Sequence, residues 1–385
     1  MAHIKKRELA RMFFRMNHFN EKGRSRFLFV FLFLAAHLIY VSESGAEKPH
    51  FQGEKIILEG LAHSYRLELD KAQEVFKKLK LLYPGSPSSL FYPAAISWGA
   101  VESDLRWRRI AELHADSKIE RELPTHSAER LIKDMRDTIT KCAKIIETRP
   151  DDFEALFYTA GAYGFTARME YYSGNYISAL IDGKKSADHF EILLNKHPER
   201  ADAKLGPGVY KYYIGGLSSP MRYLIAMLGL EGSRSEGLDL METAALRSTL
   251  SRVEAADFLT RIYRTSEGDT NKALEWANLL EEFAPGSPLA DYHRLIIHHN
   301  SGNFSSEAES AEQLLKKMEK LPDSIKGDWE PLLNFTICSA MIEKGDAKKG
   351  VEYCRKGYES PKAGNWLKSE IQPHFKRTTV IKNAR

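Results

Sequence analysis

The 385-residue sequence contains only three cysteines, Cys142, Cys338 and Cys354. So few thiols exclude a disulfide-rich scaffold, the class in which several bridges replace a large hydrophobic core. At most one bridge can form within the chain. Cys338 and Cys354 fall on the two expected helices of the last hairpin, so a bridge between them is compatible with the pattern but is not required by it.

The main part of the chain also lacks an excess of charge of one sign. The sequence has 56 basic and 52 acidic residues and a net charge of +4. Residues 1–46 contain eight of the basic and three of the acidic residues, which leaves 48 and 49 in the remainder. A near-neutral body does not offer the sustained basic surface that displaces phosphate counterions, so we expect no nucleic-acid partner.

Catalytic signatures are absent as well. The sequence has no HExxH or CxxC motif, no G-x-S-x-G elbow, no phosphate-binding P-loop and no GxGxxG motif after a strand. His298 and His299 follow His293 by five and six residues, which does not give the one-face pair of a helical metal site. We therefore expect no enzymatic activity, no cofactor and no metal; an enzyme with an unrecognised site in residues 88–126 is a minor alternative.

The N-terminus carries a pattern typical of an export signal. A basic segment at 5–26 runs into the apolar segment 27–41, whose 15 residues are fewer than the roughly 20 that span a bilayer as a helix. Ser44 and Ala46 place small residues at the −3 and −1 positions of a cleavage site. We interpret residues 1–46 as an export signal to the periplasm or cell envelope. The alternative is an uncleaved signal anchor that tethers the protein to the membrane.

The rest of the sequence has the periodicity of helices. Apolar residues recur at steps of three and four from Glu54 onward, as at Ile57, Leu61 and Tyr65, and Val/Ile/Thr alternation is nearly absent. Prolines fall between the periodic segments. Short turns of similar sequence recur at 173–179, 231–237, 267–273 and 344–350, each with a glycine that suits a left-handed helix end and a small residue five positions later.

These turns, together with a spaced set of core residues, resemble the tetratricopeptide repeat. Gly60, Ala72, Phe76 and Pro84 fall at positions 8, 20, 24 and 32 of its 34-residue pattern. Residues 204–238 are similar to the corresponding segment of the divergent tetratricopeptide family linked to the mitochondrial outer membrane and inclusion-body clearance. The resemblance implies an all-α fold, an α-solenoid of about six to seven stacked helical hairpins over residues 47–365, followed by a basic C-terminal tail at 366–385.

A solenoid of this type presents a concave surface, on which we expect a protein or peptide partner to bind. Tyrosine and arginine combine a large contact area with a polar group, and binding surfaces are enriched in both. For each tyrosine taken singly, core packing is the competing interpretation. A second patch could recognise an acidic peptide or a head group, and inward tryptophans with solvated arginines are the competing interpretation. Its residues are Trp98, Arg106, Trp107, Arg108 and Arg109. The candidate partner-binding residues are Arg168, Tyr171, Tyr172, Tyr210, Tyr213 and Arg222.

The sequence therefore predicts an exported, non-enzymatic binding scaffold or adaptor of the cell envelope. The alternative is a helper protein that binds a small molecule for an envelope transporter, in a pocket between the 168–172 turn and the segment around Tyr210. Membrane proximity would come from the N-terminal segment. The apolar stretch 221–230 is too short to span a bilayer, and we expect it to be an internal helix of the stack.

We predict that signal cleavage follows Ala46, so the mature protein begins at Glu47. N-terminal sequencing of the exported protein measures this directly. Recovery of an intact segment 27–41 from the membrane fraction would instead establish the signal anchor.

Overall fold

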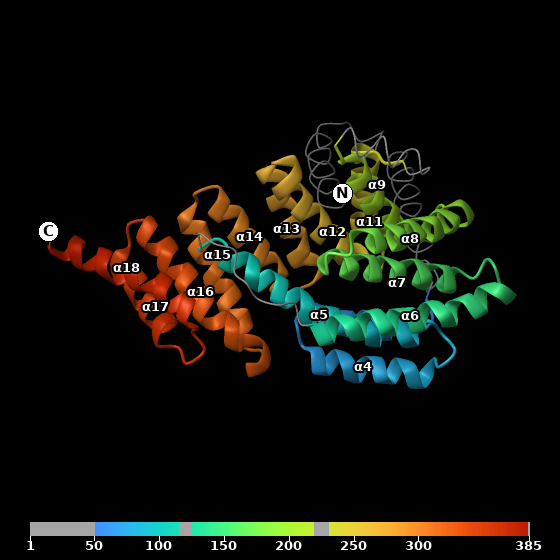
Figure 1. The fold of residues 1–385 in the computed structure, drawn as a ribbon, viewed down its shortest axis with the longest axis horizontal. Coiled ribbons are helices and arrows are strands. Elements are labelled where there is room, and N and C mark those ends of the chain that lie inside the picture. Colours follow the sequence, from blue (N-terminus) through green and yellow to red (C-terminus); the bar gives the residue numbers. More distant parts are fainter. Residues whose placement is uncertain (1–50, 115–124, 219–230, 384–385) are drawn as a thin grey trace, which may run out of the picture. The chain divides into compact units, whose positions relative to one another are not determined.

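The fold is entirely helical over the residues that the computed structural model describes, which are 51–114, 125–218 and 231–383. No β-strand occurs among them (Figure 1). A 3₁₀ turn at Ala201–Lys204 and a π-helical turn at Tyr263–Glu267 accompany the α-helices. The α-helices are α3 (Glu54–Tyr65), α4 (Leu69–Leu82), α5 (Ser88–Ala111), α6 (Thr125–Thr148), α7 (Phe153–Tyr172), α8 (Tyr176–Lys196), α9 (Leu205–Gly215), α11 (Arg234–Arg247), α12 (Arg252–Ile262), α13 (Thr270–Phe283), α14 (Leu289–Asn300), α15 (Phe304–Met318), α16 (Asp323–Glu343), α17 (Ala347–Glu359) and α18 (Asn365–Asn383).

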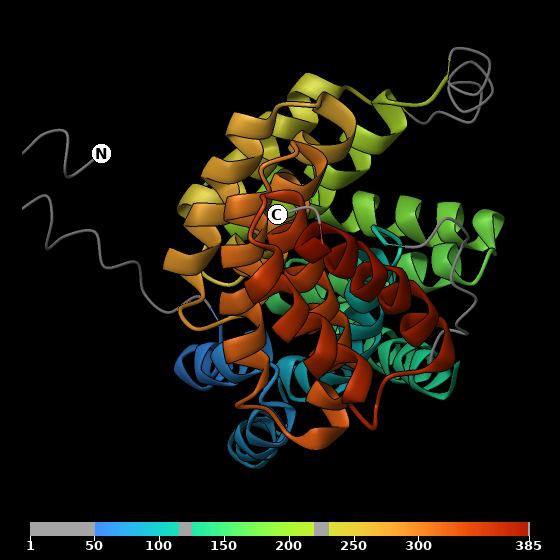
Figure 2. The ribbon, with the colours of Figure 1, turned by 90° about the vertical axis from the view of Figure 1, so that its left-hand side faces the viewer.

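Residues 52–385 form one compact unit in which each helix packs mainly on the next one in sequence. The described helices group into seven pairs, α3/α4, α5/α6, α7/α8, α9/α11, α12/α13, α14/α15 and α16/α17, followed by α18 (Figure 1). The end-on view shows the C-terminal helices lying in front of the earlier pairs (Figure 2). This arrangement confirms the predicted tetratricopeptide-like α-solenoid of six to seven hairpins.

The first pair shows why the repeat spacing produces a hairpin. Ala72, Phe76 and Leu79 form one buried face of α4, at the spacing of three and four residues that a helix requires. Gly60 of α3 lies directly against Phe76, because a Cβ atom at Gly60 would fall 2.3 Å from the phenylalanine ring. Only glycine permits this close approach, so the residues that match the repeat pattern are those that hold the two helices together.

The turns between paired helices follow the predicted geometry at most of the repeated sites. Gly174 and Gly268 have φ angles of 80° and 67°, in the left-handed region, and Gly345 has 93°. Gly232 is an exception, since its φ is not positive. Its position serves close packing instead, because an added Cβ would lie 2.4 Å from the backbone nitrogen of Gly215.

The C-terminal end of the solenoid contains the disulfide and extends beyond the boundary we predicted at residue 365. Cys338 of α16 and Cys354 of α17 form a disulfide bond, with Cα atoms 5.1 Å apart, and Cys142 is a buried free thiol. Leu367 and Ile371 of α18 are buried in the same hydrophobic cluster. Helical packing therefore continues into the segment that the sequence suggested as a basic tail.

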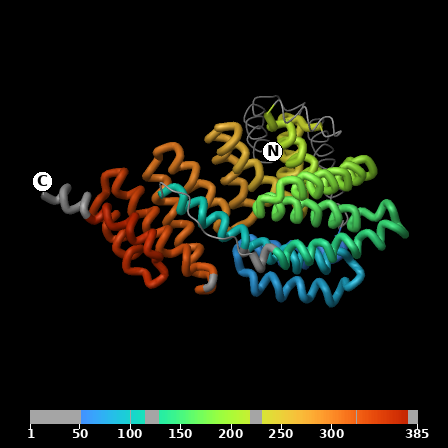
Figure 3. The backbone as a smooth tube through the Cα atoms, in the orientation of Figure 1, coloured from blue at the N-terminus to red at the C-terminus, as the bar shows by residue number. Residues whose placement is uncertain are grey.

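Contacts between distant repeats add to the contacts between neighbours. The indole of Trp107 in α5 donates a 2.8 Å hydrogen bond to the carbonyl of Asp328 in α16, and the indole of Trp329 donates to Ser103 at 3.2 Å. Ser287, before α14, donates to the carbonyl of Tyr65 at the end of α3. The path of α5 toward the α15–α16 region is visible in the backbone trace (Figure 3). These contacts bring the first hairpins against the second half of the unit.

The segment 27–41 lies outside the described residues. Within 51–114, 125–218 and 231–383, none of the helices combines the length and apolar character that crossing a bilayer requires.

We predict that Gly174→Val and Gly268→Val each destabilise the protein by about 1 kcal/mol or more, because a β-branched residue is strained in the left-handed conformation. Gly85→Val is a matched control, since Gly85 also has open space around it but does not have a positive φ. Thermal melts provide the comparison. Equal melting temperatures for Gly174→Val and Gly85→Val would contradict the role of the left-handed turn.

Candidate functional site

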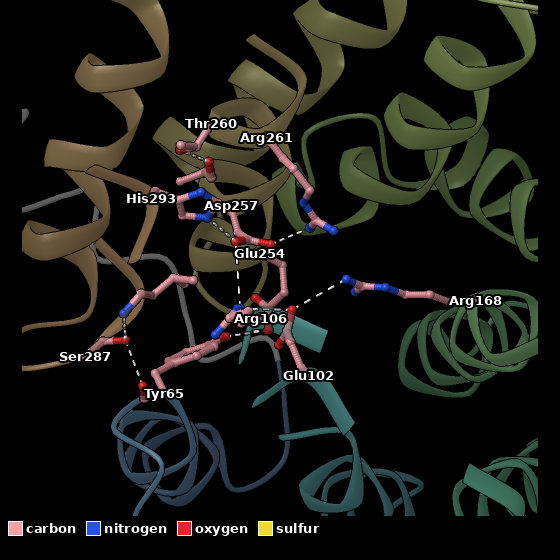
Figure 4. A network of polar contacts seen from close by, with 12 residues as sticks. Tyr65, Glu102, Arg106, Arg168, Glu254, Asp257, Thr260, Arg261, Ser287 and His293 are labelled. Atoms are coloured by element: carbon pink, nitrogen blue, oxygen red, sulfur yellow. Dashed lines mark hydrogen bonds and ion pairs between the residues drawn. The ribbon is translucent and has the colours of Figure 1, made fainter. Parts of the chain in front are cut away.

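A cluster of charged side chains lies where the first helices of several pairs meet (Figure 4). Its acidic members are Glu102 of α5 and two residues of α12, Glu254 and Asp257, and α12 adds Arg261 one turn further on. The spacing of three and four residues places the α12 side chains on one face of the helix. We call the following residues the central cluster: Tyr65, Glu102, Arg106, Arg168, Glu254, Asp257, Arg261 and His293.

Asp257 is the carboxylate on which three elements converge. It accepts from Arg261 on its own helix, from Nε2 of His293 in α14 at 2.7 Å, and it lies 3.8 Å from Nη2 of Arg106 in α5. Burial alone would raise the pKa of Asp257, but Arg261 and His293 outweigh it and hold the pKa well below its usual value. Burial lowers the pKa of His293 to about 4 despite this carboxylate, so the ring is neutral at physiological pH.

Glu102 forms the second anchor of the central cluster. Its Oε1 atom lies 2.9 Å from Nη2 of Arg106 and 3.5 Å from Nη2 of Arg168. The guanidinium of Arg168 stacks on the indole of Trp98 at 4.1 Å from the ring centroid. Arg168 is therefore held in place by a carboxylate on one side and an aromatic ring on another, which reduces the conformational entropy it would lose on binding a partner.

Glu254 differs from the other two carboxylates because no cation contacts it. The hydroxyl of Tyr65 donates to its Oε1 at 2.5 Å, whereas its buried Oε2 has no hydrogen-bond partner among the described residues. Burial raises the pKa of Glu254 to about 7, and the charges of Glu102 and Asp257 add to the rise. Near neutral pH this carboxyl group is thus divided between its charged and uncharged forms.

A cavity of about 100 Å³ lies beside Glu254 and is bounded by α3, α4, α5, α7, α12 and the start of α14. Its walls are largely apolar, with Glu102, Arg106, Arg168, Glu254 and Asp257 as the charged members. The apolar and aromatic residues that line it include Leu61, Tyr65, Phe76, Tyr92, Ile96, Trp98, Phe165, Val253, Phe258 and Leu289.

The structure places three of the residues predicted from the sequence in one region, namely Arg168, Tyr172 and Tyr213. The ring of Tyr172 stacks on Trp98 with centroids 6.3 Å apart, so Tyr172 joins Arg168 on the same indole. Tyr213 is 48% exposed. Burial raises the pKa of Tyr213, while the positive charges of Arg261 and Arg168 oppose this rise, so both charges act on the phenol. We call Trp98, Arg168, Tyr172, Tyr213 and Arg261 the Tyr213 surface.

Two of the other candidates lie beside or away from this surface. Tyr171 is 59% exposed, and its ring contacts the rings of Tyr172 and Tyr176, with centroids 5.7 Å apart in each case. Tyr210 packs near Ile214, and its hydroxyl is buried without a hydrogen-bond partner among the described residues. Burial, with the charge of Asp188, raises the pKa of Tyr210 to about 12. Arg222 and the stretch 221–230 lie outside the described residues.

Residues of the second patch lie partly in the hydrophobic core and partly in the central cluster. Trp98 and Trp107 are both buried, as the packing interpretation expects. Arg106 is not solvated but belongs to the central cluster. Our sequence reasoning missed Glu254, Asp257 and Arg261, although their spacing of three and four residues on a helix with buried neighbours was a signal that could have identified them.

The arrangement provides recognition groups rather than an assembled catalytic pair. Among the described residues, no group of three or more His, Cys, Asp and Glu side chains is placed to hold a metal ion. His293 and Asp257 resemble a base and its orienting carboxylate, but the hydroxyl of Thr260 donates to the carbonyl of Ala256 on its own helix. The site can hold a charged or aromatic group by hydrogen bonds, ion pairs and stacking.

Comparison with known proteins adds only distant structural likenesses. No protein-family model matches the chain, and no curated protein matches it in sequence. PilW, titled a widely conserved type IV pilus biogenesis factor, shares 12% identity at a TM-score of 0.40, covering 70% of this chain and 97% of PilW. The C-terminal part of a TPR repeat-containing protein from Cytophaga hutchinsonii shares 13% sequence identity at a TM-score of 0.38, and the match covers 82% of this chain and 98% of that one. Human IFIT1, solved as a dimer with m7Gppp-AAAA, shares 14% sequence identity at a TM-score of 0.38, and the match covers 80% of this chain and 68% of IFIT1.

Likenesses at these identities and TM-scores carry no information about what this chain binds. The fold assignment rests on the helix pairs and the packing of Gly60 on Phe76, and the function has to be argued from the site.

We predict that the raised pKa of Glu254 makes folding stability depend on pH. The folded protein holds this proton more tightly than the unfolded chain, so the stabilisation is complete below the ordinary pKa of 4.5 and is lost as the pH rises through about 7. Between pH 5 and pH 8 the wild type should lose up to about 3 kcal/mol relative to Glu254→Gln. Urea denaturation across this range measures the difference.

The exposed residue Glu59 of α3 provides the control for this measurement, because Glu59→Gln removes one carboxylate without touching the cavity. Its pH profile should parallel that of the wild type. A Glu254→Gln profile that also parallels the wild type would show that Glu254 does not titrate near neutral pH in the folded protein.

Proposed function

We propose that this protein is a non-enzymatic binding scaffold that captures a protein or peptide partner on the Tyr213 surface. The observations that support the proposal are the half-exposed ring of Tyr213 and two arginines whose charges act on its hydroxyl, Arg168 and Arg261, both of which are already held by carboxylates. Aromatic and arginine side chains fixed before binding lose little entropy when a partner docks, and such residues dominate interface energetics.

Export to the cell envelope is part of this proposal. Its support is the basic segment 5–26, the apolar segment 27–41 and the small residues at 44–46. The disulfide between Cys338 and Cys354 fits an oxidising compartment, where such bonds persist.

A small-molecule helper for an envelope transporter is the second candidate, and the cavity beside Glu254 is the observation that favours it. The cavity lies elsewhere than the sequence suggested, since Arg168 lines it but Tyr172 and Tyr210 do not. An apolar space with a few convergent polar groups is typical of small-ligand sites.

We predict that the double variant Arg168→Ala/Tyr213→Ala keeps its fold and loses the partner. Tyr213 is 48% exposed, and Glu102 keeps Arg106 as a partner at 2.9 Å when Arg168 is truncated, so no carboxylate loses its only cation. Loss of two interface anchors of about 2 kcal/mol each weakens binding by roughly a hundredfold or more. Affinity capture from envelope extract with quantitative mass spectrometry measures recovery, and circular dichroism checks the helical signal.

Tyr358→Ala on α17 is the matched control, because Tyr358 is also an exposed tyrosine, at 37%, and lies outside the Tyr213 surface. Proteins recovered equally by the wild type and Tyr358→Ala but not by the double variant are the expected partners. A folded double variant that recovers the same set as the wild type would refute the role of this surface.

A further inference from the structure

The cavity beside Glu254 contains one unsatisfied acceptor. Oε2 of Glu254 is buried and has no hydrogen-bond partner among the described residues, while Oε1 is taken by the hydroxyl of Tyr65. Leaving a buried acceptor unmatched costs about 1–3 kcal/mol, and more when the group is charged. A ligand that donates a hydrogen bond at this oxygen would recover that free energy.

The pairing of charges around the cavity favours a cation as that donor. The central cluster has three carboxylates and three guanidiniums, but the guanidiniums contact Glu102 and Asp257, and among the described residues none contacts Glu254. Arg106 and Arg168 are both engaged by Glu102. The titratable and charged groups that face Glu254 are Tyr65 of α3, Tyr92, Glu102 and Arg106 of α5, Arg168 of α7, and Asp257 of α12 with its partners Arg261 and His293.

The size and lining of the cavity fit an apolar stem rather than a bare ion. Its volume of about 100 Å³ is several times the roughly 10–15 Å³ that one water molecule needs, and apolar and aromatic residues form most of its wall. A cation that carries a short alkyl chain would bury that chain against Phe76, Ile96 and Val253 and keep its charge at the carboxylate. Glu102, Arg106 and Arg168 are 15–20% exposed, so this wall reaches solvent.

We propose that this cavity is a binding site for a primary ammonium group on an apolar stem, with Oε2 of Glu254 as its counter-ion. The same chemistry is carried by a lysine side chain of a partner protein and by a free alkylamine. The inference goes beyond the partner surface proposed above, because its counter-ion lies outside the Tyr213 surface.

Binding of the ammonium group requires ionised Glu254. The pKa of about 7 means that roughly a tenth of the protein has this carboxylate at pH 6 and roughly nine tenths has it at pH 8. Alkylammonium ions keep their proton across this range. The dissociation constant should therefore fall about tenfold from pH 6 to pH 8.

The experiment is a titration of the full mature protein with n-butylammonium, followed by calorimetry or NMR at pH 6 and pH 8. Butanol and butyrate, which share the stem but not the positive charge, are the comparison ligands. We expect butylammonium alone to bind with the tenfold pH effect. Glu254→Gln should weaken binding at pH 8 at least tenfold and abolish the pH effect, whereas Glu59→Gln on the exposed face of α3 should retain both.

A lysine capped at both backbone ends separates the two sources. Binding as tight as that of butylammonium supports a lysine side chain of a partner, whereas binding of butylammonium alone supports a free amine. Equal affinity for butanol and butylammonium, wild-type binding by a folded Glu254→Gln variant, or no butylammonium binding would each overturn the inference. None of these results touches the partner surface, which is tested separately by Arg168→Ala/Tyr213→Ala.

Discussion

The sharing of Asp257 by Arg106, Arg261 and His293 is the interaction on which the interior of this solenoid depends. It joins α5 to α12 and α14, two helices from a later part of the sequence. A helical repeat array ordinarily needs contacts only between neighbours. Here the first hairpins also contact the later ones, through Ser287 on Tyr65 and through Trp107 on α16. The central cluster consequently lies where early and late hairpins meet, with the side chains of Glu102, Arg106 and Arg168 partly exposed.

The contacts of the central cluster also explain why Asp257 and Glu102 have fixed partners and Glu254 does not. Removing one partner of a buried ion pair leaves an uncompensated charge, so Asp257 and Glu102 hold their arginines tightly even though such pairs add little net stability. Among the described residues, Glu254 has only the hydroxyl of Tyr65 as a side-chain partner. A buried carboxylate without a cation can become neutral by taking up a proton, whereas a guanidinium would have to lose a proton, which does not happen in proteins. Glu254 is thus the carboxylate of the central cluster whose charge is free to respond to a ligand.

The fold was largely predictable because its signals are local. Gly60 and Phe76 are 16 residues apart, and the glycine at 174 closes one helix just before the next begins. The site was predictable only in part. Arg168 and Tyr172 are four residues apart and share Trp98, whereas Tyr171, which is rotated by about 100° from Tyr172 on the helix, contacts Tyr172 and Tyr176.

Sequence spacing could not predict which distant helices contact one another. Arg106 and Asp257 are 151 positions apart, and no turn or helix period relates them. Their meeting depends on how the small rotation between successive pairs accumulates along the stack, which is a property of every intervening interface. The same accumulation sets Tyr65 against Glu254 and so creates the cavity. The proposed binding sites therefore depend on how successive pairs are arranged along the array, and a motif confined to one repeat cannot encode them.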